Sequence, residues 1–126
     1  MKANDFRIGN TIDVSGIICN ITCMEEQRLT TDYQNHWYLG FDEIEPIPLN
    51  EEWLLRLGFD SVNSKSLCES IFIVLDQDGD LFNIFLHQMN TQGGEDVILL
   101  NNTIKYVHSL QNLCYALNGR ELTPKQ

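Results

Sequence analysis

Every second residue between Ile17 and Cys23 is an isoleucine or a cysteine, and the positions between them are mostly polar. A period of two is typical of a strand with one buried face, so the pattern predicts that Cys19 and Cys23 both point into a core. Several further short strands are expected nearby, and together they predict a small SH3-like β-barrel over residues 1–48. The expected strands lie at residues 6–14, 17–24, 28–31, 36–39 and 41–48.

A short helix with clear start and stop signals is predicted at residues 50–57. Asn50 can accept a hydrogen bond from the backbone donors of the first turn, and Leu49 and Leu54 occupy the two positions of a hydrophobic staple. Gly58 can end the helix in a left-handed conformation. We expect this helix to connect the strand-rich first part of the chain to a mixed second part, residues 49–126.

The second part is predicted to contain strands at residues 71–75, 81–87 and 95–100 and a helix that Asn102 or Thr103 caps and that runs to about residue 117. Asp78-Gly79 between the first two strands is a strong hairpin signal. Asp76, Asp78 and Asp80 have the spacing that opens a calcium loop, but the glycine and glutamate of an EF-hand loop are not at their positions. The predicted fold class is α+β: the barrel and the short helix are followed by an antiparallel three-stranded sheet, which one C-terminal helix covers.

This second sheet is expected to be apolar on both faces. Ile73 and Leu75 point to one side, and Phe72 and Val74 point to the other. A sheet of this kind must be covered on both faces, and one long helix covers only one. We therefore expect the barrel or a second copy of the chain to cover the other face, and we predict a homodimer.

The chain has 126 residues, with 18 acidic and 8 basic side chains and a net charge of −10. This charge disfavours sequence-independent binding to nucleic acid. It leaves open attraction to a basic partner or mimicry of DNA. The apolar stretches are too short to span a bilayer, and the first residues lack an apolar secretory core, so we expect a cytoplasmic protein.

No phosphate-binding, nucleotide-binding or catalytic motif occurs in the sequence. The four cysteines form no Cys-x-x-Cys pair, so no metal or cofactor is expected, with a zinc site at Cys19, Cys23 and His36 as a minor alternative. A catalytic pair of Cys114 and His108 is disfavoured, because on one helix their side chains point in different directions.

Two surfaces are candidates for contact with a partner. One is a cluster of aromatic and acidic residues, which can hold a basic or proline-rich peptide. The other is a stripe along the last helix whose mixed character suits a protein interface, although a partly exposed helix surface is also consistent with it. The candidates are Tyr33, Trp37, Tyr38, Asp42 and Glu43 in the cluster, and Ile104, His108, Gln111 and Tyr115 in the stripe.

Three phrases of the sequence carry a family resemblance. Residues 6–10 read FRIGN, residues 44–59 read IEPIPLNEEWLLRLGF, and residues 104–122 read IKYVHSLQNLCYALNGREL. In these phrases the chain resembles a family of small uncharacterised proteins of gut bacteria and their phages or mobile elements. The resemblance implies a genomic setting and supplies no catalytic residues.

We therefore expect a non-enzymatic accessory or adaptor protein that binds another protein. One alternative is an acidic DNA mimic that inhibits a host DNA-binding enzyme, since the net charge of −10 permits it. The other alternative is a hydrolase or metal enzyme whose site the sequence does not reveal.

Overall fold

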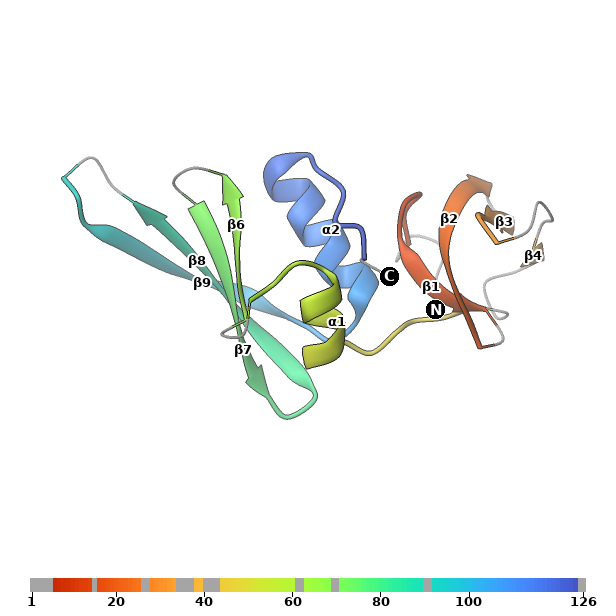
Figure 1. Ribbon diagram of the computed structural model, residues 1–126, viewed down its shortest axis with the longest axis horizontal. Helices are drawn as coiled ribbons and strands as arrows, with labels where there is room; N and C mark the ends of the chain where they lie inside the picture. The colour runs from red at the N-terminus through yellow and green to blue at the C-terminus, as the bar shows by residue number, and fades with distance from the viewer. Residues whose placement is uncertain are drawn as a thin grey trace. The chain divides into compact units, whose positions relative to one another are not determined.

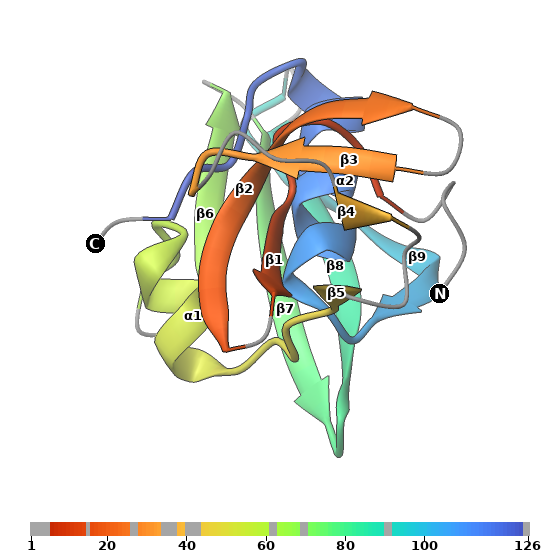
Figure 2. The same cartoon turned by 90° about the vertical axis from the view of Figure 1, so that its right-hand side faces the viewer.

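The computed structural model describes residues 6–14, 16–25, 28–33, 38–39, 44–60, 63–68, 71–89 and 92–124. These residues form an α+β protein with two antiparallel sheets, of five and four strands, and a C-terminal helix (Figure 1, Figure 2). The chain divides into a first unit, Met1–Pro48 with Tyr106–Leu113, and a second unit, Leu49–Lys105 with Cys114–Gln126. The last helix, which we assigned from the sequence to the second part alone, is thus shared between the units.

The first unit has the strand order β4-β3-β2-β1-β5, so the last strand of the sheet returns beside the first (Figure 2). The strands are β1 (Thr11–Val14), β2 (Ile17–Glu25), β3 (Arg28–Thr31), β4 (Tyr38–Leu39) and β5 (Ile44–Glu45). One apolar cluster forms the core beneath them. Its buried members are Phe6, Ile12, Val14, Cys19, Ile21, Leu29 and Ile44.

Cys19 points into this core, but Cys23 is exposed, so the prediction that both are core residues is wrong for Cys23. The cause is an irregularity in the pairing of β2 with β3, whose register shifts between Ile21 and Cys23. One extra residue in a strand reverses the alternation of its side chains beyond that point. As a result Met24, instead of Cys23, packs against the core.

The second unit has the strand order β6-β7-β8-β9. Its elements are α1 (Glu51–Arg56), β6 (Ser64–Cys68), β7 (Ile71–Asp78), β8 (Leu81–Met89), β9 (Glu95–Ile104) and the end of α2 (Val107–Asn118). α1 and the last turns of α2 lie on one face of the sheet (Figure 1, Figure 2). The sequence predicted three strands here, and it did not predict the fourth, β6.

The local signals around α1 and the hairpin are confirmed. Asn50 Oδ1 accepts a hydrogen bond of 2.9 Å from Trp53 N, and Gly58 has the left-handed φ of +95° that follows the helix. β7 and β8 are joined through Asp78 and Gly79, and Gly79 has a φ of +64°. Gly79 therefore supplies the backbone conformation that a tight turn between the two strands requires.

The last helix begins later than predicted. β9 continues to Ile104, which pairs with Phe82 of β8, and α2 begins only at Val107. Asn102 and Thr103 have the chemistry of a helix cap, but pairing with the neighbouring strand outweighs this local preference.

Candidate functional site

The predicted stripe along the last helix does not form an exposed surface. Ile104 belongs to β9 and is 7% exposed, while His108 and Gln111 lie on α2 and are 3% and 0% exposed. Of the four residues, Tyr115 is exposed, at 43%. The expectation that Ile104, His108 and Gln111 offer a contact surface to a partner is therefore wrong.

Hydrogen bonds within the first unit explain why so polar a stripe is buried. Gln111 Oε1 accepts a bond of 2.8 Å from Thr11 N, and Gln111 Nε2 donates one of 2.9 Å to Thr11 Oγ1. The same hydroxyl donates to Asn20 Oδ1 at 2.7 Å. The His108 ring packs on the Phe6 ring, with 4.6 Å between centroids. The buried amide of Gln111 is tolerated because both of its polar atoms are paired in this way.

A second set of bonds links the start of the chain to α2 in the same unit. Asn112 Oδ1 accepts bonds from Arg7 Nε at 3.0 Å and from Asn10 Nδ2 at 2.7 Å. Asn10 Oδ1 in turn accepts a bond of 2.6 Å from Arg7 N. Two of the phrases that carry the family resemblance thus contact each other, and their polar residues have a structural role in holding the helix to the sheet.

The aromatic-acidic cluster is only partly within the described residues. Tyr33 follows β3 and is 52% exposed. The backbone of Tyr38 forms part of β4, but its side chain lies outside the described part, as do Trp37, Asp42 and Glu43. The geometry of this cluster stays a prediction.

A different apolar surface lies at the β9 edge of the second sheet. We define the β9 surface as Glu95–Leu99 together with the neighbouring Phe85 and Met89 of β8. Ile73, Leu86 and Ile98 are direct neighbours across β7, β8 and β9 on the face that carries the helices. Their exposure rises along this row: Ile73 is 0% exposed, Leu86 is half-buried, and Ile98 is 50% exposed. The elements that bury the β7 side chains on this face therefore do not extend over β9.

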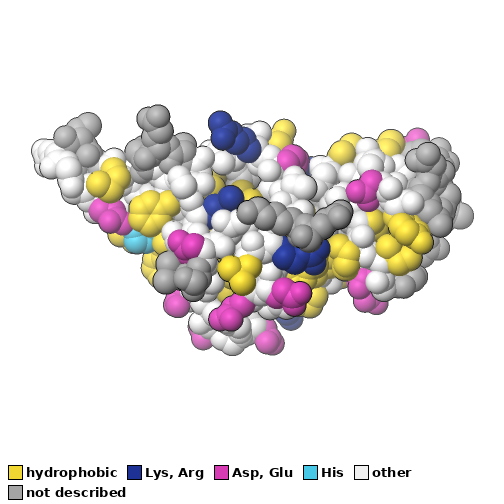
Figure 3. Space-filling model, in the orientation of Figure 1, with side chains coloured by type: hydrophobic (Ala, Val, Ile, Leu, Met, Phe, Trp, Pro, Cys, Tyr) yellow, Lys and Arg dark blue, Asp and Glu magenta, His cyan; other side chains and the backbone are white. Residues whose placement is uncertain are grey.

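The opposite face of β9 is also open. Val97 and Leu99 are 54% and 56% exposed, and Met89 of β8 is 46% exposed. Phe85 pairs with Leu99 on this face and is half-buried. In Figure 3 hydrophobic side chains, with acidic ones among them, are visible on the part of the surface where Figure 1 places β8 and β9.

The backbone edge of β9 completes this surface. β9 is the outermost strand in the described sheet, so one of its edges pairs with no other described strand. Proteins usually protect such edges with charges or irregularities. Here Glu95 and Asp96 place acids at the start of the strand, and Glu95 also bonds to His87. The run from Val97 to Leu99 carries no charge, so it is available for pairing.

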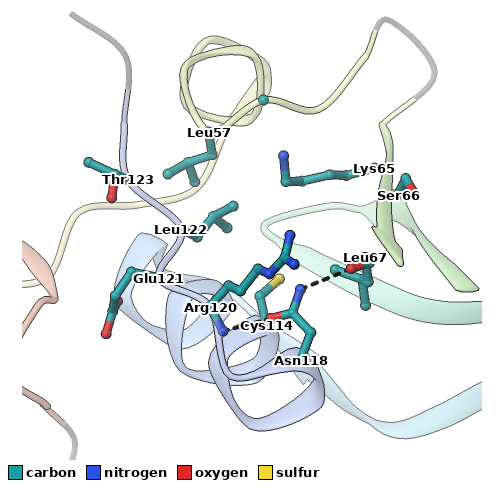
Figure 4. A pocket seen from close by; sticks show the side chains of 11 residues that line it. Leu57, Lys65, Ser66, Leu67, Cys114, Asn118, Arg120, Glu121, Leu122 and Thr123 are labelled. Carbon is teal, nitrogen blue, oxygen red and sulfur yellow. Dashed lines mark hydrogen bonds between the residues drawn. The ribbon is translucent and has the colours of Figure 1, made fainter. Parts of the chain in front are cut away.

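The second unit also contains a cavity of about 390 Å³ between the end of α1, β6, the end of α2 and the segment that follows α2. Lys65 and Arg120 extend their cationic ends toward the same part of this cavity, whereas the carboxylate of Glu121 points away from them (Figure 4). The buried apolar side chains of the lining are Leu57, Leu67, Cys114 and Leu122.

Backbone and side-chain contacts hold the walls of this cavity. A Cβ added to Gly58 would lie 2.7 Å from Lys65 Nζ, so the end of the lysine side chain lies beside the glycine. Asn118 Nδ2 donates a bond of 3.3 Å to Leu67 O, and Asn118 Oδ1 accepts one of 3.0 Å from Arg120 N. Asn118 thereby joins the end of α2 both to β6 and to the segment carrying Arg120.

The cysteine of the cavity is not a nucleophile at neutral pH. Burial raises the pKa of Cys114 to about 11, and the positive charge of Lys65 offsets only part of this effect. The reactive form of a cysteine is the thiolate, so the Cys114 side chain acts as a small apolar group of the cavity wall.

Sequence reasoning missed both the cavity and the open face around β9. Residues 64–66 are all polar, so no alternation of apolar and polar residues marks β6 as a strand. The position of Arg120 depends on how the segment after α2 folds back, and no local pattern predicts this either.

No protein-family model matches the chain, and comparisons with curated proteins and with solved structures give no match. In the described ranges, no helix combines the length and the apolar character needed to cross a membrane. The same ranges contain no group of three or more His, Cys, Asp or Glu side chains that could hold a metal ion.

Proposed function

We propose that this chain is a non-enzymatic accessory protein that binds another protein, in the phage or mobile-element setting that its resemblance implies. Its partner contributes an extended segment that pairs with the free edge of β9. The observation that carries this proposal is the run Val97–Leu99, whose three side chains are each at least 50% exposed although they lie on both faces of the sheet.

An added strand would remove an energetic cost at this edge. Full burial of an aliphatic side chain contributes roughly 1.5–3 kcal/mol. The three residues from Val97 to Leu99 are about half exposed, so covering them completely would contribute roughly 3 kcal/mol, and an added strand, which covers them from the side, supplies a part of this. Strand addition also satisfies the backbone donors and acceptors of the edge, while side-chain pockets supply specificity.

The charges at the edge suggest the chemistry of the partner. Glu95 and Asp96 stand at the start of the strand, and the whole chain carries a net charge of −10. An apolar segment with basic residues at its ends is complementary to this edge. A second copy of the chain would bring the same two acids as part of a net charge of −10, which favours another protein as the occupant.

A peptide experiment tests this proposal on the full chain. The probe is a synthetic peptide of alternating valine and threonine with lysine at both ends, and the control peptide has glutamate at both ends. We expect the lysine peptide to slow hydrogen exchange of backbone amides in Glu95–Leu99 and to bind at least about tenfold more tightly than the glutamate peptide. Leu99→Lys should abolish the protection, whereas Leu81→Lys, at another exposed leucine of the same sheet, should retain it.

Two results would overturn the proposal. One is equal binding of both peptides, or an equal loss of amide protection in Leu99→Lys and Leu81→Lys, which would indicate non-specific adhesion. The other is a dimer mass by light scattering that reverts to a monomer in Leu99→Lys. That result would assign the β9 surface to a second copy, as the homodimer predicted from the sequence requires. A monomer mass leaves the edge available for another protein.

We also propose that the first unit is the small SH3-like barrel expected from the sequence. The pairing of β1 with both β2 and β5 supports this proposal, because the first and last strands of such barrels are neighbours. NMR contacts between amide protons of β4 and β5 are expected if the barrel closes. An open sheet would lack them.

A further inference from the structure

We propose that the cavity at the end of α2 binds a small organic anion, either a carboxylate or a phosphate monoester, that carries a short apolar group. The proposal is independent of the β9 surface. It rests on two cationic side chains that point into one cavity, and on the apolar side chains that line the cavity around them (Figure 4).

The placement of the two cations is unusual for so acidic a chain. Only 8 of its side chains are basic, against 18 acidic ones, yet Lys65 and Arg120 both line this cavity. Among the described residues, neither forms an ion pair. Lys65 is also half-buried, so its charge is less screened than that of a surface lysine. An anion between the two groups would neutralise them.

The two cations have complementary roles in holding an anion. The planar guanidinium of Arg120 offers parallel donors that match two oxygens of a carboxylate or phosphate group. The ammonium group of Lys65 acts as a compact point charge and lies beside Gly58, which has no side chain to exclude it. Together they define the end of the cavity at which the anionic group would bind.

The remaining wall selects for an apolar group on the same ligand. Leu57, Leu67 and Leu122 are 2%, 6% and 6% exposed and line the cavity. A cavity of about 390 Å³ lies at the lower end of the size range for small-molecule sites. It therefore suits a ligand of the size of a single substituted ring. Since Cys114 stays a neutral thiol, we infer binding without a covalent step.

The test is a titration of the ¹⁵N-labelled full chain with matched probes. Benzoate and phenyl phosphate supply the two anionic groups on one ring, benzyl alcohol supplies the ring without charge, and inorganic phosphate supplies charge without the ring. We expect benzoate or phenyl phosphate to shift the amide resonances of Lys65, Asn118 and Arg120, and the stronger of the two identifies the anionic group. Benzyl alcohol and inorganic phosphate should each bind at least about tenfold more weakly.

Matched variants connect the binding to the two cations. Arg120→Gln and Lys65→Gln should each weaken the better probe by about tenfold, and Lys105→Gln, which makes the same change at an exposed lysine, should not. Arg120 is exposed after the end of α2, so its variant keeps the test valid if Lys65→Gln does not fold. Benzyl alcohol binding as tightly as benzoate, unchanged binding in Arg120→Gln, or no shift by either anion at about 10 mM would each overturn the proposal.

Discussion

Replacing Gln111 with methionine should destabilise the protein, because it removes the buried amide that holds α2 to β1. The substitution preserves the length and approximate volume of the side chain but deletes both of its bonds to Thr11, of 2.8 and 2.9 Å. The Thr11 hydroxyl still donates to Asn20, so the deletion chiefly affects the Thr11 backbone N–H. Thr11 is 1% exposed, and water therefore cannot replace the lost acceptor.

The expected loss can be estimated from this single unpaired donor. Leaving a buried donor without a partner costs about 1–3 kcal/mol, and the lower desolvation cost of methionine offsets a part of it. We therefore expect Gln111→Met to lower the free energy of unfolding by about 2 kcal/mol. Gln77→Met makes the same change at an exposed glutamine and should stay within about 0.5 kcal/mol of the wild type.

Urea denaturation followed by circular dichroism measures the free energy of unfolding, and hydrogen exchange at the Thr11 amide measures the lost bond directly. The Thr11 amide should exchange faster in Gln111→Met, and a double-mutant cycle with Thr11→Val should give a coupling energy above about 0.5 kcal/mol. If Gln111→Met unfolds like the wild type and the exchange rate at Thr11 does not change, the bonds contribute nothing and the reasoning fails.

Three further predictions concern the second unit and its cysteine. Cys114 should react with iodoacetamide far more slowly than the exposed Cys23 at pH 8, and equal labelling of both sites would contradict this. Burial raises the pKa of Cys114 from 9.0 to about 11. The contribution of the buried thiol to stability is therefore complete below about pH 9 and is lost as the pH rises through 11. Asn50→Ala should cost about 1 kcal/mol of stability through loss of the helix cap, whereas an unchanged urea midpoint would show that the cap is dispensable. Gly58→Ala should cost about 1–3 kcal/mol, because its φ of +95° lies outside the left-handed region that an alanine can adopt, whereas Lys65 Nζ, 2.7 Å from the new Cβ, is the end of a flexible side chain that can move. Gly79→Ala, at a φ of +64° inside that region, should cost less, and the reverse order would refute the argument from backbone strain.

The elements that the sequence predicted correctly are those decided by near neighbours in the chain. The cap at Asn50 and the turn at Gly79 depend on side chains within a few residues, and both are present. The corrections arise where strands pair. A shift in register turned Cys23 outward, and pairing with Phe82 kept Ile104 in a strand. Pairing between distant segments leaves little trace in local patterns.

The candidate site was less predictable than the fold, because it depends on burial. The stripe that contains Gln111 has the composition of an interface, but its polar atoms bond to β1 and are buried. The exposure of Ile98, in turn, follows from where the helices stop covering their face of the sheet. An apolar strand has the same sequence pattern whether it is covered or not, so only the arrangement of the helices distinguishes the two.

The sharing of α2 between the units constrains the order in which the two units can fold during synthesis on the ribosome. The first unit contains Tyr106–Leu113, and Val107 N donates to Ile47 O within it at 2.8 Å. The strands of residues 11–45 are therefore synthesised long before the helix that completes their unit. Domains usually fold from the N-terminus as they emerge, but here the first unit must wait for the strands of the second. A chain truncated before residue 106 would lack a segment of each unit, so neither unit would be complete.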